Sequence, residues 1–112
     1  MKGQHLGEFE ELVLLATGIL SSEAYGFSVQ QEIERQTGRT ASLAAIHTAL
    51  YRLQEKGYVD SILGGASSKR GGRRKRLYSI TASGMQALSH ARSVRERLWS
   101  ALQQVQPFFS GS

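Results

Sequence analysis

The sequence predicts a mainly α-helical fold with one small β-hairpin and a long C-terminal helix. Two observations indicate this class. In four separate segments, apolar side chains recur every three or four residues, which is the spacing of one helical face. Between the third and fourth segments lie two stretches rich in β-branched and aromatic residues, joined by a glycine-containing loop, which is typical of a hairpin. At 112 residues, the chain can build one hydrophobic core but not two.

The first two helices are expected over residues 6–20 and from about residue 27 to residue 37. Gly38 then provides the left-handed residue that often ends a helix. In the second helix, Val29 and Ile33 should face the core. The apolar face of the first helix should consist of Phe9, Leu12, Val13, Ala16, Ile19 and Leu20.

The third helix has the clearest pattern, because Ser42 is a favourable N-cap and Gly57 follows its end. Its core-facing stripe should consist of Leu43, Ile46, Leu50 and Leu53. Because successive residues are roughly 100° apart, this stripe leaves the opposite face of the helix open, with His47 on the flank of that face. That face carries Ala44, Ala45, Thr48, Tyr51, Arg52 and Glu55. Its small side chains make the face slim enough to enter a groove.

Two strands are expected over residues 58–63 and 74–80, and together they form a hairpin. Residues 69–76 near its tip contain six Lys or Arg, interrupted only by Gly71 and Gly72. The glycines permit a tight tip. So many like charges repel one another, so the segment needs either bulk water or a polyanion beside it.

Thr81 should cap a last helix that runs to about Gln106, where Pro107 stops it. This helix would be roughly 37 Å long, too long to be covered by so small a domain. One side has coiled-coil-like spacing, and we expect it to mediate dimerisation. That side consists of Leu88, Ala91, Val94, Leu98, Leu102 and Val105. Trp99, the single tryptophan, belongs either to this interface or to the wall of a pocket for an aromatic ligand.

The charge distribution favours nucleic acid as partner, with an anionic membrane surface second. The net charge is +5, and twelve of the fourteen basic residues lie between residues 39 and 97, against three acidic ones. Cysteine is absent and the three histidines are scattered, so we expect no disulfide, metal or other cofactor. No Ser, His and Asp arrangement suggests an enzyme. The apolar run "LVLLATGIL" is too short to span a membrane, so a cytoplasmic protein is expected.

The predicted order of three helices, a strand, a basic loop, a strand and a helix is that of a winged helix-turn-helix. In this fold the third helix enters a DNA groove, and the basic hairpin tip can reach phosphates beside it. The domain boundaries follow from this order of elements. Residues 1–80 should form the DNA-binding domain, and residues 81–112 the dimerisation helix and tail.

Four segments in this order resemble the PadR family of bacterial transcriptional regulators, over about residues 6–98. They are "LGEFEELVLLA", "AYGFSVQQEIE", "SLAAIHTALYRLQEKGYV" and "RGGRRKRLYSITASG". Because the chain lacks a long C-terminal domain, it is similar to the short class. The resemblance implies a homodimeric repressor that binds a double-stranded DNA operator and dimerises through its C-terminal helix. Short members can bind flat, hydrophobic effectors between these helices, which would release the repressor.

By position, the resemblance implies two groups of DNA-binding residues. The recognition group is Ser42, Ala44, Ala45, His47, Thr48, Tyr51 and Arg52. The wing group is Lys69, Arg70, Gly71, Gly72, Arg73, Arg74 and Lys75. The chain departs from the family where it has His47 in place of the frequent Tyr, and Ala45 in place of the frequent Gly. A histidine that contacts phosphate would strengthen DNA binding below about pH 6.5.

Three alternatives stay open. Arg52 could have a structural role by pairing with Glu55 or Glu11. The chain could be a protein-interaction scaffold whose long helix binds a non-identical partner and whose basic wing binds nucleic acid without specificity. It could also be an RNA-binding module, although the sequence offers no set of aromatic side chains for stacking single-stranded bases.

Overall fold

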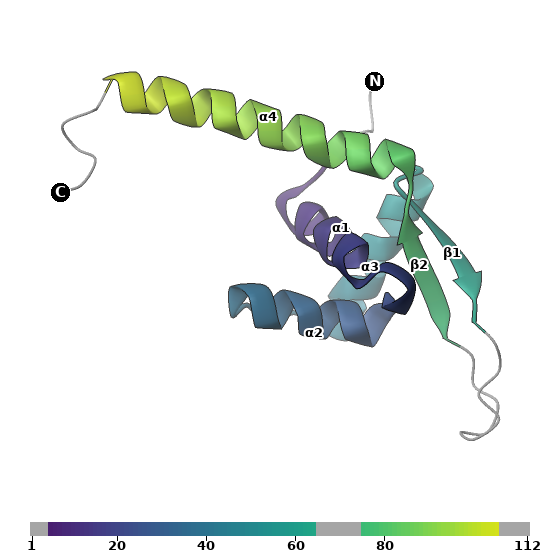
Figure 1. Ribbon diagram of the computed structural model, residues 1–112. Helices are drawn as coiled ribbons and strands as arrows, with labels where there is room; N and C mark the ends of the chain where they lie inside the picture. The colour runs from purple at the N-terminus through teal and green to yellow at the C-terminus, as the bar shows by residue number, and fades with distance from the viewer. Residues whose placement is uncertain (1–4, 65–74, 106–112) are drawn as a thin grey trace.

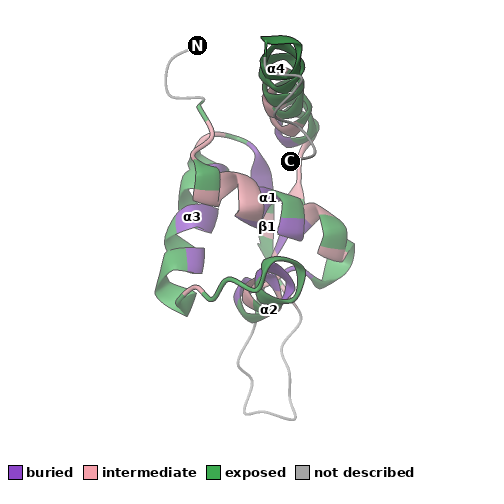
Figure 2. Cartoon of the chain, turned by 90° about the vertical axis from the view of Figure 1, so that its left-hand side faces the viewer, coloured by how far each residue is buried: buried purple, intermediate pink, exposed green. Residues whose placement is uncertain are grey.

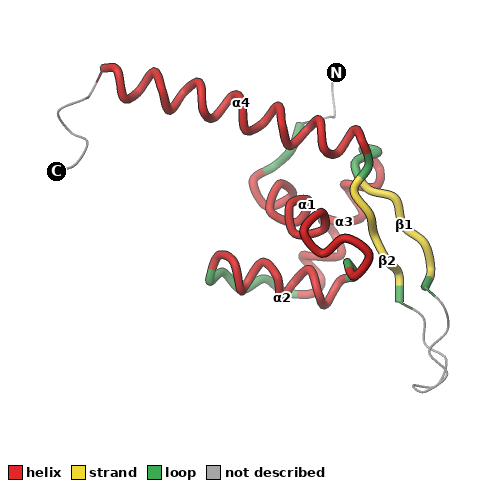
Figure 3. Tube along the Cα trace, viewed as in Figure 1, coloured by secondary structure: helices red, strands yellow, loops and turns green. Residues whose placement is uncertain are grey.

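The computed structural model describes residues 5–64 and 75–105, and within these ranges the chain folds into helices around a small hairpin (Figures 1 and 3). The predicted order is confirmed, with one added 3₁₀ turn. The elements are α1 (Glu8–Leu20), η1 (Ser21–Glu23), α2 (Gly26–Thr37), α3 (Leu43–Glu55), β1 (Val59–Leu63), β2 (Arg76–Ile80) and α4 (Ala82–Val105). The hairpin tip and the predicted stop of the last helix at residues 106 and 107 lie outside the described residues.

Helix α1 is the centre of the fold, and its buried surface is broader than the sequence pattern predicts. Val13 and Ala16 are buried as expected, but Leu14 is fully buried as well. The expectation for Ile19 was wrong, because this side chain is 56% exposed. The physical reason is that α1 contacts α2 and α3 on one side and β2 and α4 on another, so the buried arc follows two sets of neighbours. The buried hydroxyl of Thr17 donates to the carbonyl of Val13 over 2.8 Å.

Helix α3 begins as predicted, because the hydroxyl of Ser42 accepts a hydrogen bond from the backbone N–H of Ala45 over 3.0 Å. The expectation for Leu43 was wrong, since it is 40% exposed. The core lies against the middle and the end of α3, so the first turn extends past it. The residues of α3 that are buried are Ile46, Ala49, Leu50 and Leu53.

The hairpin is a two-stranded antiparallel sheet in which Val59 lies opposite Ile80. Tyr58, Val59 and Tyr78 contribute to the core, which also includes Val29 and Ile33 of α2, as predicted. Strand β1 begins one residue later than expected, and Lys75, expected in the second strand, lies just before β2. Helix α2 ends at Gly38, whose φ of 74° lies in the left-handed region that favours glycine.

Helix α4 is attached to the rest of the chain mainly through its first turns. The hydroxyl of Thr81 accepts from the N–H of Gly84 over 3.0 Å and donates to the carbonyl of Gly57 over 2.7 Å. Gly84 is the one described residue of α4 that is buried. From Arg95 onward every described residue of the helix is exposed (Figure 2). The predicted long helix is thus confirmed, and about half of it extends beyond the body.

Candidate nucleic-acid interface

The open face of α3 points away from the core. Every residue of the predicted recognition group is exposed, and Tyr51 is 63% exposed. The buried residues of α3 all lie on the other face of the helix. The sequence therefore predicted correctly which face is available for binding, while contact with DNA stays a prediction.

Arg52 forms no ion pair with any described residue. The two carboxylates considered as its partners are bonded elsewhere. Glu55 is hydrogen-bonded by Tyr51, and Glu11 accepts from Arg95 over 2.8 Å. The hydrogen bond to Glu55 and the negative charge of that carboxylate raise the pKa of the Tyr51 hydroxyl. Arg52 therefore stays on the open face, exposed and outside any of these ion pairs.

Lys56 holds the end of α3 on the start of α1. Its ammonium lies 2.7 Å from Glu10 Oε1 and also donates to the backbone carbonyl of His5. Burial alone would raise the pKa of Glu10. The hydrogen bonds from Lys56 and the Gly7 N–H, with the charges of Lys56 and Arg52, outweigh burial and hold the pKa below its ordinary value. This ion pair fixes where α3 sits on the body.

The root of the hairpin is held on both sides. On one side, the ammonium of Lys75 lies 4.1 Å from the centre of the Tyr25 ring. On the other, Arg76 Nη1 donates to Ser61 Oγ over 3.1 Å, and Ser61 Oγ donates to Gln54 Oε1 of α3 over 3.1 Å. The hairpin is therefore attached to the end of α3. The rest of the predicted wing group lies outside the described residues, namely Lys69, Arg70, Gly71, Gly72, Arg73 and Arg74.

His47 lies on the flank of α3, as predicted, and its ring packs on the backbone of Gly26 at the start of α2. A Cβ atom placed on Gly26 would lie 2.6 Å from His47 Cε1 and 2.9 Å from Nε2.

The sequence reasoning did not assign a role to Tyr25 or Gly26. The available signal was the segment "AYGF", in which an aromatic residue and a glycine stand together directly before the expected start of the second helix.

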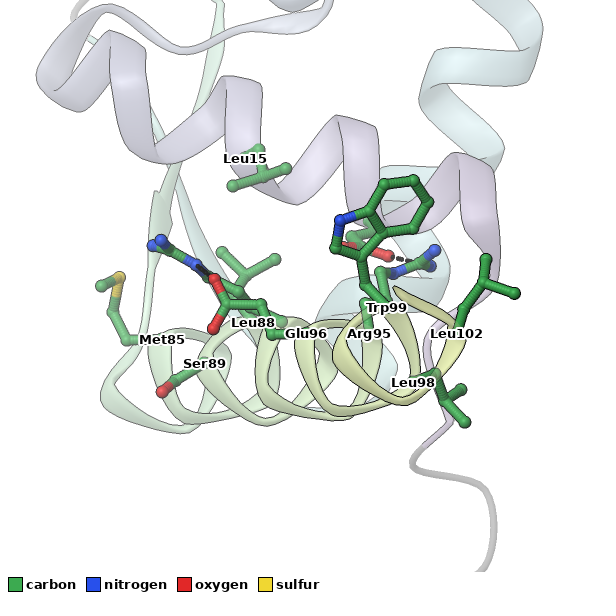
Figure 4. Close-up of a pocket in the computed structure, with 11 residues that line it drawn as sticks. Leu15, Met85, Leu88, Ser89, Arg95, Glu96, Leu98, Trp99 and Leu102 are labelled. Atoms are coloured by element: carbon green, nitrogen blue, oxygen red, sulfur yellow. Dashed lines mark hydrogen bonds and ion pairs between the residues drawn. The ribbon is translucent and has the colours of Figure 1, made fainter. Parts of the chain in front are cut away.

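A second surface lies between α1 and α4, in a groove of about 890 Å³. Trp99 extends from α4 toward α1, and Leu15 faces it from α1 (Figure 4). Trp99 is 61% exposed and Leu98 is 67% exposed. The Glu11–Arg95 pair joins the two helices beside this groove. Of the predicted dimerisation stripe, Leu88 packs against the protein's own core, while Ala91 and Val94 are half-buried and Leu98, Leu102 and Val105 are exposed.

A family model described as the transcriptional regulator PadR-like family matches residues 15–90. This span covers more than half of the chain. The chain belongs to the PadR-like family. Members of this family regulate transcription and are not enzymes. No match was found among curated protein sequences.

Solved structures of PadR-like regulators share the fold. A PadR-like regulator from Bacillus cereus is 20% identical, with a TM-score of 0.67 and 93% of each chain covered. A PadR family regulator from Eggerthella lenta is 20% identical, with a TM-score of 0.61, over 90% of this chain and 83% of the other. PadR from Bacillus subtilis, solved in complex with operator DNA, is 19% identical, with a TM-score of 0.60. That match covers 73% of this chain and 46% of the B. subtilis chain. At these identities the similarity establishes the winged-helix fold.

Across residues 5–64 and 75–105, no helix is both long enough and apolar enough to cross a membrane. In the same ranges, no three His, Cys, Asp or Glu side chains come together as a metal site would require.

Proposed function

We propose that the protein is a sequence-specific DNA-binding regulator that acts as a homodimeric repressor. The observation that carries the proposal is the exposed, slim face of α3, fixed by the Ser42 cap and the Lys56–Glu10 pair beside a hairpin that leads into the basic segment. A helix held in this way can enter a major groove, while basic side chains beside it bind phosphates. The B. subtilis PadR–operator complex supports DNA as the partner.

Within this function, the two groups of residues have different tasks. The recognition group on α3, which includes Thr48 and Arg52, reads base edges and so provides preference for the operator. The wing group, including Arg73 and Arg74, binds phosphates and so strengthens binding to all DNA. We assign residues 1–80 to DNA binding and residues 81–112 to dimerisation, and place the protein in the cytoplasm.

Exposed apolar side chains on α1 and α4 support the homodimer. Trp99, Leu98, Leu102 and Val105 of α4 are between 46% and 69% exposed, and Leu15 of α1 is 43% exposed. A contiguous apolar surface of this kind usually marks an interface. A second copy packed here brings two α3 helices onto one face of DNA, and they must lie about 34 Å apart to enter successive major grooves.

A flat hydrophobic effector is the ligand class that fits the groove beside Trp99. If it binds between the C-terminal helices of a dimer and favours a different spacing of the two α3 helices, it releases the operator. It does so only to the extent that it binds one geometry more tightly than the other. This part of the proposal rests on the apolar lining of the groove and on the exposed indole.

A gel-shift series tests the function. The wild type is compared on DNA upstream of its own gene and on scrambled DNA of equal length, at two salt concentrations. Arg73→Ala with Arg74→Ala should weaken binding to both DNAs equally and flatten the dependence of log K on log salt by up to ~0.9 per lost phosphate contact. Thr48→Ala or Arg52→Ala should lower only the preference for the upstream DNA.

Each outcome has a meaning. A wild-type shift of dimer size on the upstream fragment alone supports an autoregulating repressor. If the two sets of variants behave alike, the proposed division of tasks is wrong. If the wild type binds both DNAs weakly and forms a stable complex with a non-identical protein through α4, the scaffold alternative replaces this proposal.

A further inference from the structure

One short segment touches both elements that the proposed function assigns to DNA. This is the 24–26 junction, which consists of Ala24 and Tyr25 between η1 and α2 and of Gly26, the first residue of α2. The carbonyl of Ala24 accepts a hydrogen bond from the N–H of Tyr78 over 2.8 Å, so the junction lies directly beside β2 (Figure 1). Its other two residues contact one side chain each, His47 of α3 and Lys75 at the root of the hairpin.

Gly26 determines where the ring of His47 can lie. With any other residue at position 26, a Cβ atom would come within 2.6 Å of His47 Cε1, which is closer than nonbonded atoms approach. The ring is at the end of an exposed, rotatable side chain, so it can move aside while the fold stays intact. A side chain at position 26 therefore displaces a group on the flank of the open face of α3, at little cost to the core.

Tyr25 holds Lys75 without neutralising it. The ammonium lies 4.1 Å from the ring centre, a distance typical of a cation–π contact. The backbone of Tyr25 is itself fixed, because its N–H donates to Ser28 Oγ over 2.9 Å and Ser28 Oγ donates to the carbonyl of Glu23 over 2.7 Å. A carboxylate in place of the ring would cancel the charge of Lys75. The aromatic ring positions the ammonium and leaves its full charge for a phosphate.

We infer that Tyr25 and Gly26 are positioning residues for DNA recognition. The junction places His47 beside the groove-entering helix and Lys75 at the root of the phosphate-binding hairpin, and it connects both through one short piece of backbone. The start of α2 thereby sets the spacing between the two DNA-binding elements. The inference rests on the proposed function and adds to it a pair of residues that need not touch DNA themselves.

The Gly26 arm of the test uses a duplex that the wild type selects from a random-sequence pool, and a scrambled duplex of the same composition. Binding is followed by fluorescence anisotropy. Gly26→Ala should weaken binding to the selected duplex by about tenfold and leave binding to the scrambled duplex unchanged. In the His47→Ala background, adding Gly26→Ala should change nothing further, because the displaced ring is gone. Gly18→Ala is the matched control, since a Cβ at Gly18 meets only ordinary contacts at 3.8 Å.

The Tyr25 arm compares two substitutions. Tyr25→Phe keeps the ring and should bind as the wild type does. Tyr25→Leu removes the ring and should flatten the salt dependence on both duplexes by up to ~0.9. In the free protein, NMR should show the Lys75 side-chain protons shifted by the ring in the wild type and in Tyr25→Phe, and unshifted in Tyr25→Leu. Circular dichroism confirms that each variant is folded.

The outcomes separate the two proposals. If the wild type prefers the selected duplex but Gly26→Ala binds like the wild type, or weakens binding equally with and without His47, the inference is overturned alone. Identical salt dependence in Tyr25→Leu and Tyr25→Phe overturns its second half. If the wild type binds both duplexes equally while NMR still shows the ring over Lys75, the proposed function fails, and the inference fails with it.

Discussion

Gly84→Ala should destabilise the protein although alanine is the better helix former. A Cβ atom at this position would collide with the carbonyl oxygen of Tyr58 and lie 2.8 Å from Ile80 Cγ1. Ordinary carbon contacts begin at about 3.5 Å, so the Ile80 contact alone would make the start of α4 retreat by roughly 0.7 Å, and the closer Tyr58 oxygen requires at least as much. The same carbonyl of Tyr58 accepts from the N–H of Thr81 over 3.0 Å, and the retreat would weaken this bond.

The size of the effect follows from two opposing terms. Overpacking of this kind costs about 1–3 kcal/mol, and the helix propensity of alanine returns at most about 1 kcal/mol. We therefore expect a net loss of roughly 1–2 kcal/mol, and a fall in Tm of about 4 °C or more per kcal/mol. Gly18→Ala is the control, since its Cβ would lie in ordinary contact with Ile80 at 3.8 Å, and it should gain about 0.5–1 kcal/mol.

The assay is urea unfolding followed by circular dichroism, at one fixed protein concentration because association would add to apparent stability. The two variants should shift the midpoint in opposite directions with unchanged slopes. If Gly84→Ala were as stable as Gly18→Ala, then α4 would not be seated against Tyr58 in the way described.

The remaining predictions concern the cap, the ion pair and the apolar helix. Ser42→Ala should cost about 1 kcal/mol of stability; Ser42→Asp should keep the cap and the stability but weaken DNA binding through charge repulsion, as urea unfolding and anisotropy will show. Because the pKa of Glu10 is lowered in the folded state, its contribution to stability is present above its ordinary value of 4.5 and is lost as the pH falls through the folded value. Lys56→Met should therefore cost about 1–2 kcal/mol at pH 7 and less at pH 3, and an equal cost at both pH values would contradict this account of the pair. Trp99→Ala should weaken dimerisation by about 2 kcal/mol or more in sedimentation equilibrium, and an unchanged dissociation constant would remove the indole from the interface.

The sequence predicted those features of the fold that depend on local chemistry. The Ser42 cap, the stop at Gly38 and the start of α4 after Thr81 are each determined by one residue and its backbone neighbours, and all three are confirmed. The errors at Ile19 and Leu43 have a different origin. Helical spacing defines a face, but which end of that face is covered depends on where distant elements pack.

In the candidate site, too, the sequence predicted only what depends on a single element. The open face of α3 could be predicted, because it is the complement of an apolar stripe within one helix. The roles of Tyr25 and Gly26 could not, because their contacts with Lys75 and His47 join residues that are far apart in the sequence. A glycine at the start of a helix has many explanations until its neighbour in space is known.

The way α4 is attached has a mechanical consequence. The helix is held at Gly84, and its last described residue, Val105, lies 21 residues farther along, or roughly 31 Å at 1.5 Å per residue. Between these two points Leu88 packs on the core and Arg95 pairs with Glu11. If that exposed ion pair opens, a tilt of about 5° at Gly84 displaces the far end by roughly 3 Å. A substitution at the first turn of α4 can in this way shift an apolar surface that it never touches.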